Sequence, residues 1–169
     1  MKKIVIIGPE STGKTTLAQQ LATHFQSPMV EEYARAYLDR LDRPYNQQDL
    51  LVIARGQLKN EDFFRNSTAS WLFCDTDLRV IKVWSNYKFG RVHPWIQEQI
   101  KLRTCQAYLL MNIDLPWDPD PQREHPENRK EIFELYQSEV KSSGVPFKFI
   151  TGIDQARLKK AIDFILHLA

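Results

Sequence analysis

The stretch that most constrains the fold is residues 4–16, IVIIGPESTGKTT. Its first four residues are apolar and β-branched, which indicates a parallel strand buried on both faces. The strand ends at Gly8, and the helix predicted from Lys14 onward carries Leu17 and Leu21 on one stripe. The residues between strand and helix match the G-x-x-x-x-G-K-[ST] pattern at every fixed position. We therefore predict a strand, a phosphate-binding loop (the P-loop) and a helix.

A loop of this kind is suited to hold phosphate. Its backbone N–H groups point inward, and the new helix adds the positive end of its dipole. In this motif the Lys14 ammonium reaches the β- and γ-phosphates, and the Thr15 hydroxyl reaches Mg²⁺. A glycine turn that binds nothing is the alternative, but the flanking strand and helix favour nucleotide binding. The loop residues expected to contact ATP are Gly8, Glu10, Ser11, Thr12, Gly13, Lys14, Thr15 and Thr16.

The composition is that of one ordinary globular domain over residues 1–169. The 23 basic and 21 acidic residues leave a net charge of +2, which gives no reason to expect nucleic acid or an anionic membrane as a partner. No apolar run approaches the ~20 residues of a membrane helix, and the first one is too short for a signal peptide. Cys74 and Cys105 lack a C-x-x-C spacing and are interpreted as reduced core residues. We expect a cytoplasmic protein.

A carboxylate pair follows the second predicted strand. This short strand ends near Glu31 and Glu32, before a helix predicted from Tyr33 to Leu41. Residues at the carboxyl ends of parallel strands face the ligand crevice of an open α/β sheet. Glu32, and less strongly Glu31, is therefore placed to receive a substrate hydroxyl. The alternative is that both carboxylates only favour the N-terminus of the next helix.

The third predicted strand, residues 71–74, runs directly into Asp75-Thr76-Asp77. A short apolar strand that ends on aspartate is the Walker B pattern, in which the carboxylate holds Mg²⁺ directly or through water. Together with the P-loop it assigns Asp75 to the metal. Asp77 is either a second carboxylate of the site or part of the first turn of the next helix.

The helix predicted over residues 46–65 begins at Asn46, which is a good N-cap residue. Its polar residues Asp49, Arg55 and Gln57 could reach a substrate, but we favour a solvated helix face as their role. The aromatic residues of the following helix are expected in the core: Trp84, Tyr87 and Phe89.

Residues 114–129, DLPWDPDPQREHPENR, are the least core-like part of the chain, with four prolines and many charges. A disordered linker is one interpretation. Because the stretch joins two core elements, we favour a mobile lid over the site. Arg123 and Arg129 would then bring guanidinium groups to the transferring phosphoryl group, although ordinary surface arginines are the alternative.

The order of elements is β-α repeated around five strands, the last of them over residues 146–150. This pattern predicts a three-layer α/β/α domain with a parallel sheet. The loop after the fifth strand commonly lies beside the adenine in P-loop kinases. Gly152, Ile153 and Arg157 are therefore candidates for the adenine side of the ATP site.

The motifs outside the P-loop indicate which class of P-loop protein this chain belongs to. The base-reading N-K-x-D motif of GTPases is absent from the sequence, and AAA-type machines need a longer chain. A P-loop, a carboxylate after the second strand, Asp75 and a lid with arginines together describe a small-molecule kinase that excludes water. A nucleotide-binding regulator with little or no turnover is an alternative from another class.

Several motifs together resemble one family, the nicotinamide riboside kinase domain of NadR-type proteins. They are GPESTGKT, EEYARAYL, DTDLRVIKVWS, the LPWD turn, and the spacings of Asp49 to Gln57 and of Gly152 to Arg157. The similarity extends over nearly the whole chain. Its most specific parts are E-Y-A-R after the second strand and D-T-D after the third.

The resemblance implies phosphorylation of the 5′-hydroxyl of nicotinamide riboside with ATP and Mg²⁺, giving nicotinamide mononucleotide for NAD salvage. By that analogy Glu32 or Asp77 would hold the ribose hydroxyls, and Trp117 and Tyr87 would stack on the pyridinium ring. A cationic ring over an indole gains ~0.5–2 kcal/mol. Larger family members add a nucleotidyltransferase, which 169 residues do not accommodate, so we expect only the kinase activity here. A kinase for another nucleoside or metabolite is the closest alternative.

Overall fold

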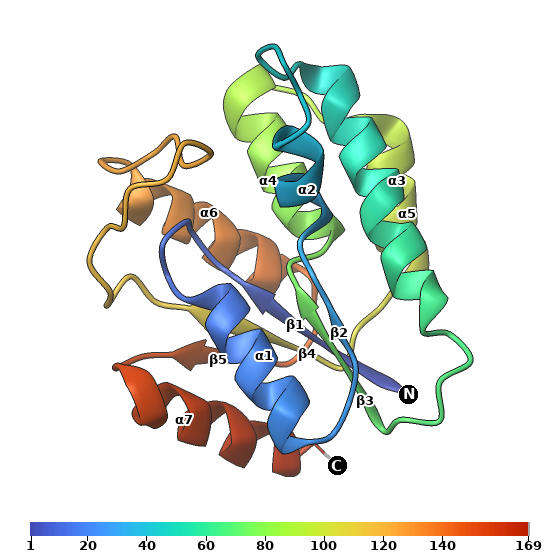
Figure 1. The fold of residues 1–169 in the computed structure, drawn as a ribbon, viewed down its shortest axis with the longest axis vertical. Coiled ribbons are helices and arrows are strands. Elements are labelled where there is room, and N and C mark those ends of the chain that lie inside the picture. Colours follow the sequence, from blue (N-terminus) through green and yellow to red (C-terminus); the bar gives the residue numbers. More distant parts are fainter. Residues whose placement is uncertain (169) are drawn as a thin grey trace.

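The fold is built around a parallel sheet with the strand order β2-β3-β1-β4-β5 (Figure 1). The computed structural model describes residues 1–168. The strands are β1 (Lys2–Ile7), β2 (Met29–Val30), β3 (Trp71–Asp75), β4 (Ala107–Met111) and β5 (Phe147–Ile150). The predicted apolar run lies in the central strand β1, and Ile4 to Ile7 are fully buried. A central strand is covered on both faces, which explains a run without polar alternation.

Helices cover both faces of the sheet, so the predicted three-layer α/β/α fold is confirmed (Figure 1). The helices are α1 (Lys14–His24), α2 (Tyr33–Leu38), α3 (Gln47–Phe63), α4 (Leu78–Phe89), α5 (Pro94–Leu102), α6 (Arg129–Ser142) and α7 (Asp154–Leu166). On one face, Leu21 of α1 and Ile165 of α7 join the core with Ile4 and Ile6. On the other face, Val83 of α4 and α6 residues pack on the opposite side of the same strands.

A third apolar cluster joins α2, α3, α4 and α5 beyond the sheet. Helix α2 lies on α3 at Gly56, where a Cβ atom would stand 2.2 Å from Cε1 of the Tyr33 ring. The Tyr33 backbone N–H also donates to Oε1 of Gln57 at 2.9 Å. These contacts fix the start of α2, and with it the preceding residue Glu32.

Helix α3 begins with a reciprocal cap, and two of its polar residues are not solvated as we had expected. Asn46 accepts from the N–H of Asp49, and the Asp49 carboxylate accepts from the Asn46 N–H at 2.7 Å. Asp49 also accepts from Arg43 and Tyr37, while Gln57 holds α2, and both residues are buried. The prediction of a solvated face was therefore wrong for Asp49 and Gln57, because loop and α2 residues cover that side.

Smaller differences concern element ends. Helix α2 ends at Leu38 and not Leu41, with 3₁₀-type bonds such as Leu41 N–H to the Leu38 carbonyl continuing the turn. Cys74 is buried, Cys105 is partly buried, and both are free thiols. None of the helices among residues 1–168 is long and apolar enough to cross a membrane.

Candidate active site

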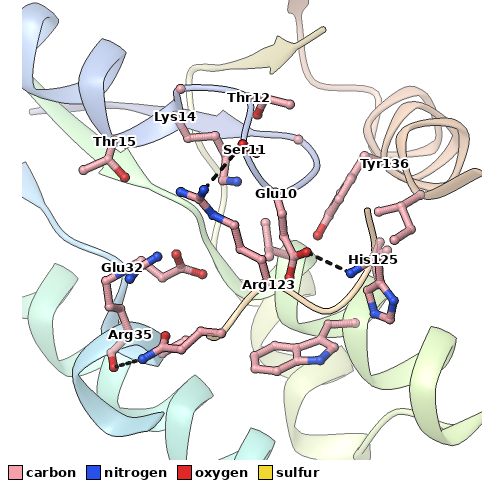
Figure 2. A pocket seen from close by; sticks show the side chains of 18 of the residues that line it. Glu10, Ser11, Thr12, Lys14, Thr15, Glu32, Arg35, Arg123, His125 and Tyr136 are labelled. Atoms are coloured by element: carbon pink, nitrogen blue, oxygen red, sulfur yellow. Dashed lines mark hydrogen bonds between the residues drawn. The ribbon is translucent and has the colours of Figure 1, made fainter. Parts of the chain in front are cut away.

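A cavity lies at the carboxyl ends of the strands, between the P-loop, α2, α4, the lid (residues 114–129) and α6 (Figure 2). Every P-loop residue that was predicted to contact ATP lines it. The other walls come from elements far apart in the sequence, including Glu32 before α2, Arg123 in the lid and Tyr136 in α6. The topology of the sheet thus gathers a phosphate loop, a carboxylate and an arginine around one space.

The P-loop is shaped to accept an anion. A Cβ atom on Gly8 would lie 2.9 Å from the Met111 carbonyl oxygen, so the loop can pass β4 only as glycine. Gly13, at φ 78°, is the N-cap of α1, which has no side-chain cap and no acidic residue in its first turn. Its first N–H groups and its positive dipole end therefore stay available for phosphate. The Lys14 ammonium lines the cavity and donates to the Pro9 carbonyl at 2.9 Å.

Thr15 and Asp75 form the candidate metal site. Thr15 Oγ1 donates to Asp75 Oδ2 at 2.5 Å. The second carboxylate oxygen, Oδ1, is buried and has no hydrogen-bond partner among the described residues. Burial raises the pKa of Asp75, while the Lys14 charge opposes the rise. An orphaned carboxylate oxygen beside a threonine hydroxyl suits Mg²⁺, so the residues fit the predicted ion.

The remaining Mg²⁺ ligands would come from outside the protein. Within residues 1–168, no three histidine, cysteine or acidic side chains gather into a group that could hold a metal. Mg²⁺ in phosphoryl-transfer sites is usually held by one or two carboxylates together with substrate phosphates and water. Thr15 and Asp75 are therefore sufficient only when a nucleotide supplies the other oxygens.

Glu32 is directed into the cavity from the end of β2 (Figure 2). Glu32 is the N-cap of α2 in an extended conformation, but its side chain makes no capping hydrogen bond. Burial raises the pKa of Glu32, and the nearby Lys14 charge opposes that rise. Glu31, by contrast, is exposed. Of the two carboxylates, Glu32 alone has the position that the sequence argument required.

The lid is bound to the P-loop through Glu10 (Figure 2). Glu10 Oε2 accepts the backbone N–H of Glu124 at 3.1 Å and that of His125 at 3.3 Å. Burial raises the pKa of Glu10, and these bonds oppose the rise. Arg123 lines the cavity and donates from Nη1 to the Ser11 hydroxyl at 3.4 Å. The structure therefore brings Arg123 beside the phosphate loop.

Arg129 and Trp117 lie outside the cavity. Arg129, the first residue of α6, donates to the carbonyl oxygens of Leu115 and Ser11, each at 3.0 Å. Its guanidinium carbon lies 5.9 Å from the centre of the Trp117 ring. These contacts hold the base of the lid. The geometry thus gives no support to a phosphoryl contact for Arg129 or to ring stacking on a substrate for Trp117.

Arg157 is a buried brace behind the P-loop. Its guanidinium donates to the carbonyl oxygens of Thr12, of Gly152 at 2.6 Å and of Asn112 at 3.1 Å, and the side chain is 5% exposed. It therefore joins the P-loop to the ends of β4 and β5. The predicted place of Arg157 beside the adenine is not the one that the structure gives it, since its donors face backbone carbonyls.

Asp77 also has a structural role. Its carboxylate caps α4 by accepting the N–H of Arg79 at 2.8 Å, and it accepts from the Tyr108 hydroxyl at 2.8 Å. Asp77 is buried and lies away from the cavity that contains Glu32. Of the two roles left open for Asp77, the structure favours the helix turn.

Most aromatic side chains of the cavity wall were missed from the sequence, and only Tyr87 was placed at the substrate, by the family resemblance. Trp84 and Tyr87 of α4, His125 of the lid and Tyr136 of α6 all line the space. Figure 2 shows the Tyr136 hydroxyl directed toward it. On α4 the lining residues Val80, Val83, Trp84 and Tyr87 follow helical spacing. The same stripe would be expected for a core helix, and Trp84 was assigned to the core for that reason.

Curated relatives of this chain are NadR proteins. The chain is 26% identical over 99% of its length to the trifunctional NAD biosynthesis/regulator protein NadR of Salmonella typhimurium. It is 28% identical, over the same share, to the protein of the same description from Escherichia coli. The chain spans 43% of the length of each relative.

Solved structures give the same picture of the fold. A crystal structure of NadR in complex with NR matches 99% of this chain and 49% of that chain, with 25% identity and a TM-score of 0.82. A NadR structure with NAD and AMP-PNP matches with a TM-score of 0.81 and 26% identity. The thymidylate kinase of Ehrlichia chaffeensis has the same fold, with a TM-score of 0.71 at 13% identity.

The family assignment rests on the length of the match. Residues 3–157 match the AAA_28 family, described as an AAA domain. This range runs from β1 through the P-loop, Asp75 and the lid to Arg157 in α7. The resemblance to NadR-type proteins that the motifs predicted is confirmed by these matches. The chain belongs to the AAA_28 family of AAA domains.

Proposed function

We propose that this chain is an ATP-dependent kinase that phosphorylates the 5′-hydroxyl of nicotinamide riboside. The observation that carries the proposal is the Glu32 carboxylate, which lies in the same cavity as Lys14 and Thr15 of the P-loop. A pure nucleotide sensor has no need of a carboxylate at the acceptor position. The NadR structures matched by this chain contain NR in one case and NAD with AMP-PNP in the other, which supports the substrate pair.

In the proposed reaction the 5′-oxygen forms a bond to the γ-phosphorus, and the bond from that phosphorus to the β–γ bridging oxygen breaks. The hydroxyl proton passes to Glu32, whose burial-raised pKa makes it a better proton acceptor than an exposed glutamate. Lys14 and Arg123 offset the negative charge that develops on the transferred group. Positioning contributes more than base strength, because the transition state is loose.

Thr15 and Asp75 would hold Mg²⁺, which supplies positive charge to the phosphate oxygens when it is bound. The P-loop N–H groups and the uncapped start of α1 bind the phosphates themselves. The lid, bound to the P-loop through Glu10, keeps water from the γ-phosphate. Thr15 and Glu10 line the cavity, and Asp75 is joined to it by its hydrogen bond from Thr15.

The aromatic wall suits a cationic ring. We assign ring stacking to Trp84 and Tyr87, which line the cavity, in place of Trp117, which lies outside it. A pyridinium ring over an indole face gains ~0.5–2 kcal/mol. The carboxylates of Glu10 and Glu32 in the same cavity further favour a positively charged acceptor.

The test is ADP release with Mg·ATP across a panel of nucleosides that includes nicotinamide riboside. We expect turnover that depends on nicotinamide riboside. Turnover only with another nucleoside would retain the kinase chemistry and replace the substrate. If ADP release ignores every acceptor while ATP still binds, the chain is a nucleotide-binding regulator and the proposal is wrong.

A further inference from the structure

The lid residue Glu124 is hydrogen-bonded to both sides of the cavity. On the acceptor side, Trp84 Nε1 donates to the Tyr45 hydroxyl at 2.7 Å, and that hydroxyl donates to Glu124 Oε2 at 2.7 Å. On the phosphate side, the backbone N–H of Glu124 donates to Glu10 Oε2 at 3.1 Å. Hydrogen bonds to the side chain and from the backbone of Glu124, here called the Tyr45–Glu124 relay, therefore link the aromatic wall through the lid to the P-loop.

The surroundings of Tyr45 keep the relay in one geometry. Its ring meets the Trp84 ring edge to face, with 4.9 Å between centres. Lys88 Nζ lies 3.7 Å from the centre of the Tyr45 ring and donates to both Glu124 oxygens, at 3.0 and 3.1 Å. Burial works to raise the pKa of Glu124, but the bonds from Tyr45 and Lys88 outweigh it, and the pKa is lowered. Glu124 is therefore an ionised acceptor that holds two donors.

We propose that Tyr45 and Glu124 are positioning residues that couple the acceptor ring to closure of the lid. A substrate ring stacked on Trp84 fixes the Trp84 indole, and the indole N–H then orients the Tyr45 hydroxyl. The oriented hydroxyl fixes the Glu124 side chain, and with it the bond from the Glu124 backbone to Glu10. The substrate that completes the aromatic wall thus also steadies the lid that excludes water from the γ-phosphate. The predicted effect on turnover rests on the proposed kinase function. The predicted effect on the lid rests on the hydrogen bonds alone.

The first test compares Tyr45→Phe with Tyr37→Phe. Both variants remove a 2.7 Å bond from a tyrosine hydroxyl to a carboxylate, but the Tyr37 bond to Asp49 lies outside the cavity. Hydrogen exchange of the lid amides, residues 114–129, is measured without ligand. Since a bond to a charged group is lost, we expect exchange about tenfold faster in Tyr45→Phe than in wild type, and unchanged in Tyr37→Phe. Equal exchange in all three proteins would overturn the relay.

The second test measures coupling. With Mg·ATP alone, Tyr45→Phe should hydrolyse ATP about tenfold faster than wild type, and with nicotinamide riboside its acceptor KM should rise more than its kcat falls. The affinity for an ATP analogue should stay unchanged, because the P-loop is intact. If the lid amides of Tyr45→Phe exchange faster but its ATP hydrolysis and its acceptor KM equal those of wild type, the proposed coupling is wrong.

A double variant separates the relay from a general loss of packing. Glu124→Gln should reproduce the Tyr45→Phe effects, and the two changes together should cost little more than either one, because both break the same chain. Additive effects would contradict a relay. If wild type shows no turnover with nicotinamide riboside, the proposed function fails, while lid exchange in these variants still decides whether the relay holds the lid.

Discussion

Thr15 Oγ1 donates a 2.5 Å hydrogen bond to Asp75 Oδ2, and this bond joins the first turn of α1 to the end of β3. The strands β1 and β3 are parallel neighbours, with Ile6 paired to Asp75, so the sheet itself brings the P-loop and the carboxylate together. The unpartnered Oδ1 of Asp75 is the cost of this arrangement. A buried acceptor without a donor destabilises the protein until a cation reaches it.

Asp75→Asn should stabilise the protein in the absence of nucleotide and Mg²⁺. Burial raises the folded-state pKa of Asp75 above its unfolded value, so the ionised form opposes folding. The penalty is absent below the ordinary pKa of about 3.9 and complete once the pH exceeds the folded-state value. We expect Tm at pH 8 to rise by about 2–4 °C, the scale of 1 kcal/mol, and the gain from Mg·ATP to disappear. The exposed Asp163→Asn in α7 is the control, and equal Tm changes in both would contradict the metal role.

Lys14→Ala should lower kcat by at least ~100-fold, the scale of one lost charge-stabilising contact. The Lys14 ammonium lines the cavity at the phosphate loop, where it donates to the Pro9 carbonyl. Steady-state kinetics with Mg·ATP and the acceptor measure the effect, and Lys59→Ala on the exposed side of α3 is the matched control. Near-normal turnover of Lys14→Ala would rule out the catalytic role of the P-loop lysine.

Glu32→Gln should lower kcat at least ~100-fold, the lower end of general base catalysis, and leave ATP affinity nearly unchanged. Only the ionised carboxylate accepts a proton, and burial raises the pKa of Glu32. The wild-type kcat should therefore increase with pH through a pKa above the ordinary ~4.3 of glutamate. A pH–rate profile of the variant should lack that rise. Loss of ATP binding with kcat preserved would move Glu32 from the acceptor side to the nucleotide.

The P-loop, the sheet and the carboxylates at the strand ends could be predicted from the sequence, because each is indicated by residues that lie close together in the chain. An apolar run, a glycine pattern and a following aspartate each lie within a few residues, and parallel strands align their ends. Trp84 could not be assigned in the same way. A helix stripe that packs on a core and one that lines a cavity have the same spacing, and only the position of the lid distinguishes them.

Polar side chains with structural partners were the other source of error. Arg157 was expected beside the adenine because it follows the loop after the fifth strand, but its donors face backbone carbonyls. Asp77, which was left open between the site and the first helical turn, caps α4. Several partners come from segments remote in sequence: Thr12 and Asn112 for Arg157, and Tyr108 for Asp77. A buried guanidinium needs several acceptors, and which acceptors converge on it depends on the completed fold.

Gly56→Ala should destabilise the protein, although helix propensity alone favours alanine by about 1 kcal/mol. The added Cβ would lie 2.2 Å from the Tyr33 ring, and overpacking of this kind costs about 1–3 kcal/mol. Tyr33 follows Glu32, so the acceptor KM should increase as well. Urea unfolding measures the stability. Tyr33→Leu added to Gly56→Ala should recover part of the loss, and an increase in stability of Gly56→Ala alone would contradict the tight contact.

Arg157→Ala should lower the stability of the nucleotide-free protein and also weaken ATP binding. The substitution removes the hydrogen bonds that hold the P-loop to the ends of β4 and β5. The side chain donates to three carbonyl groups, those of Thr12, Gly152 and Asn112, and lies outside the cavity. Buried acceptors left without donors cost about 1–3 kcal/mol each. Thermal unfolding of the ligand-free protein and titration with an ATP analogue measure the two effects, with the exposed Lys159→Ala as control. If ATP affinity falls while ligand-free stability equals that of wild type, Arg157 contacts the nucleotide directly and its role as a brace is wrong.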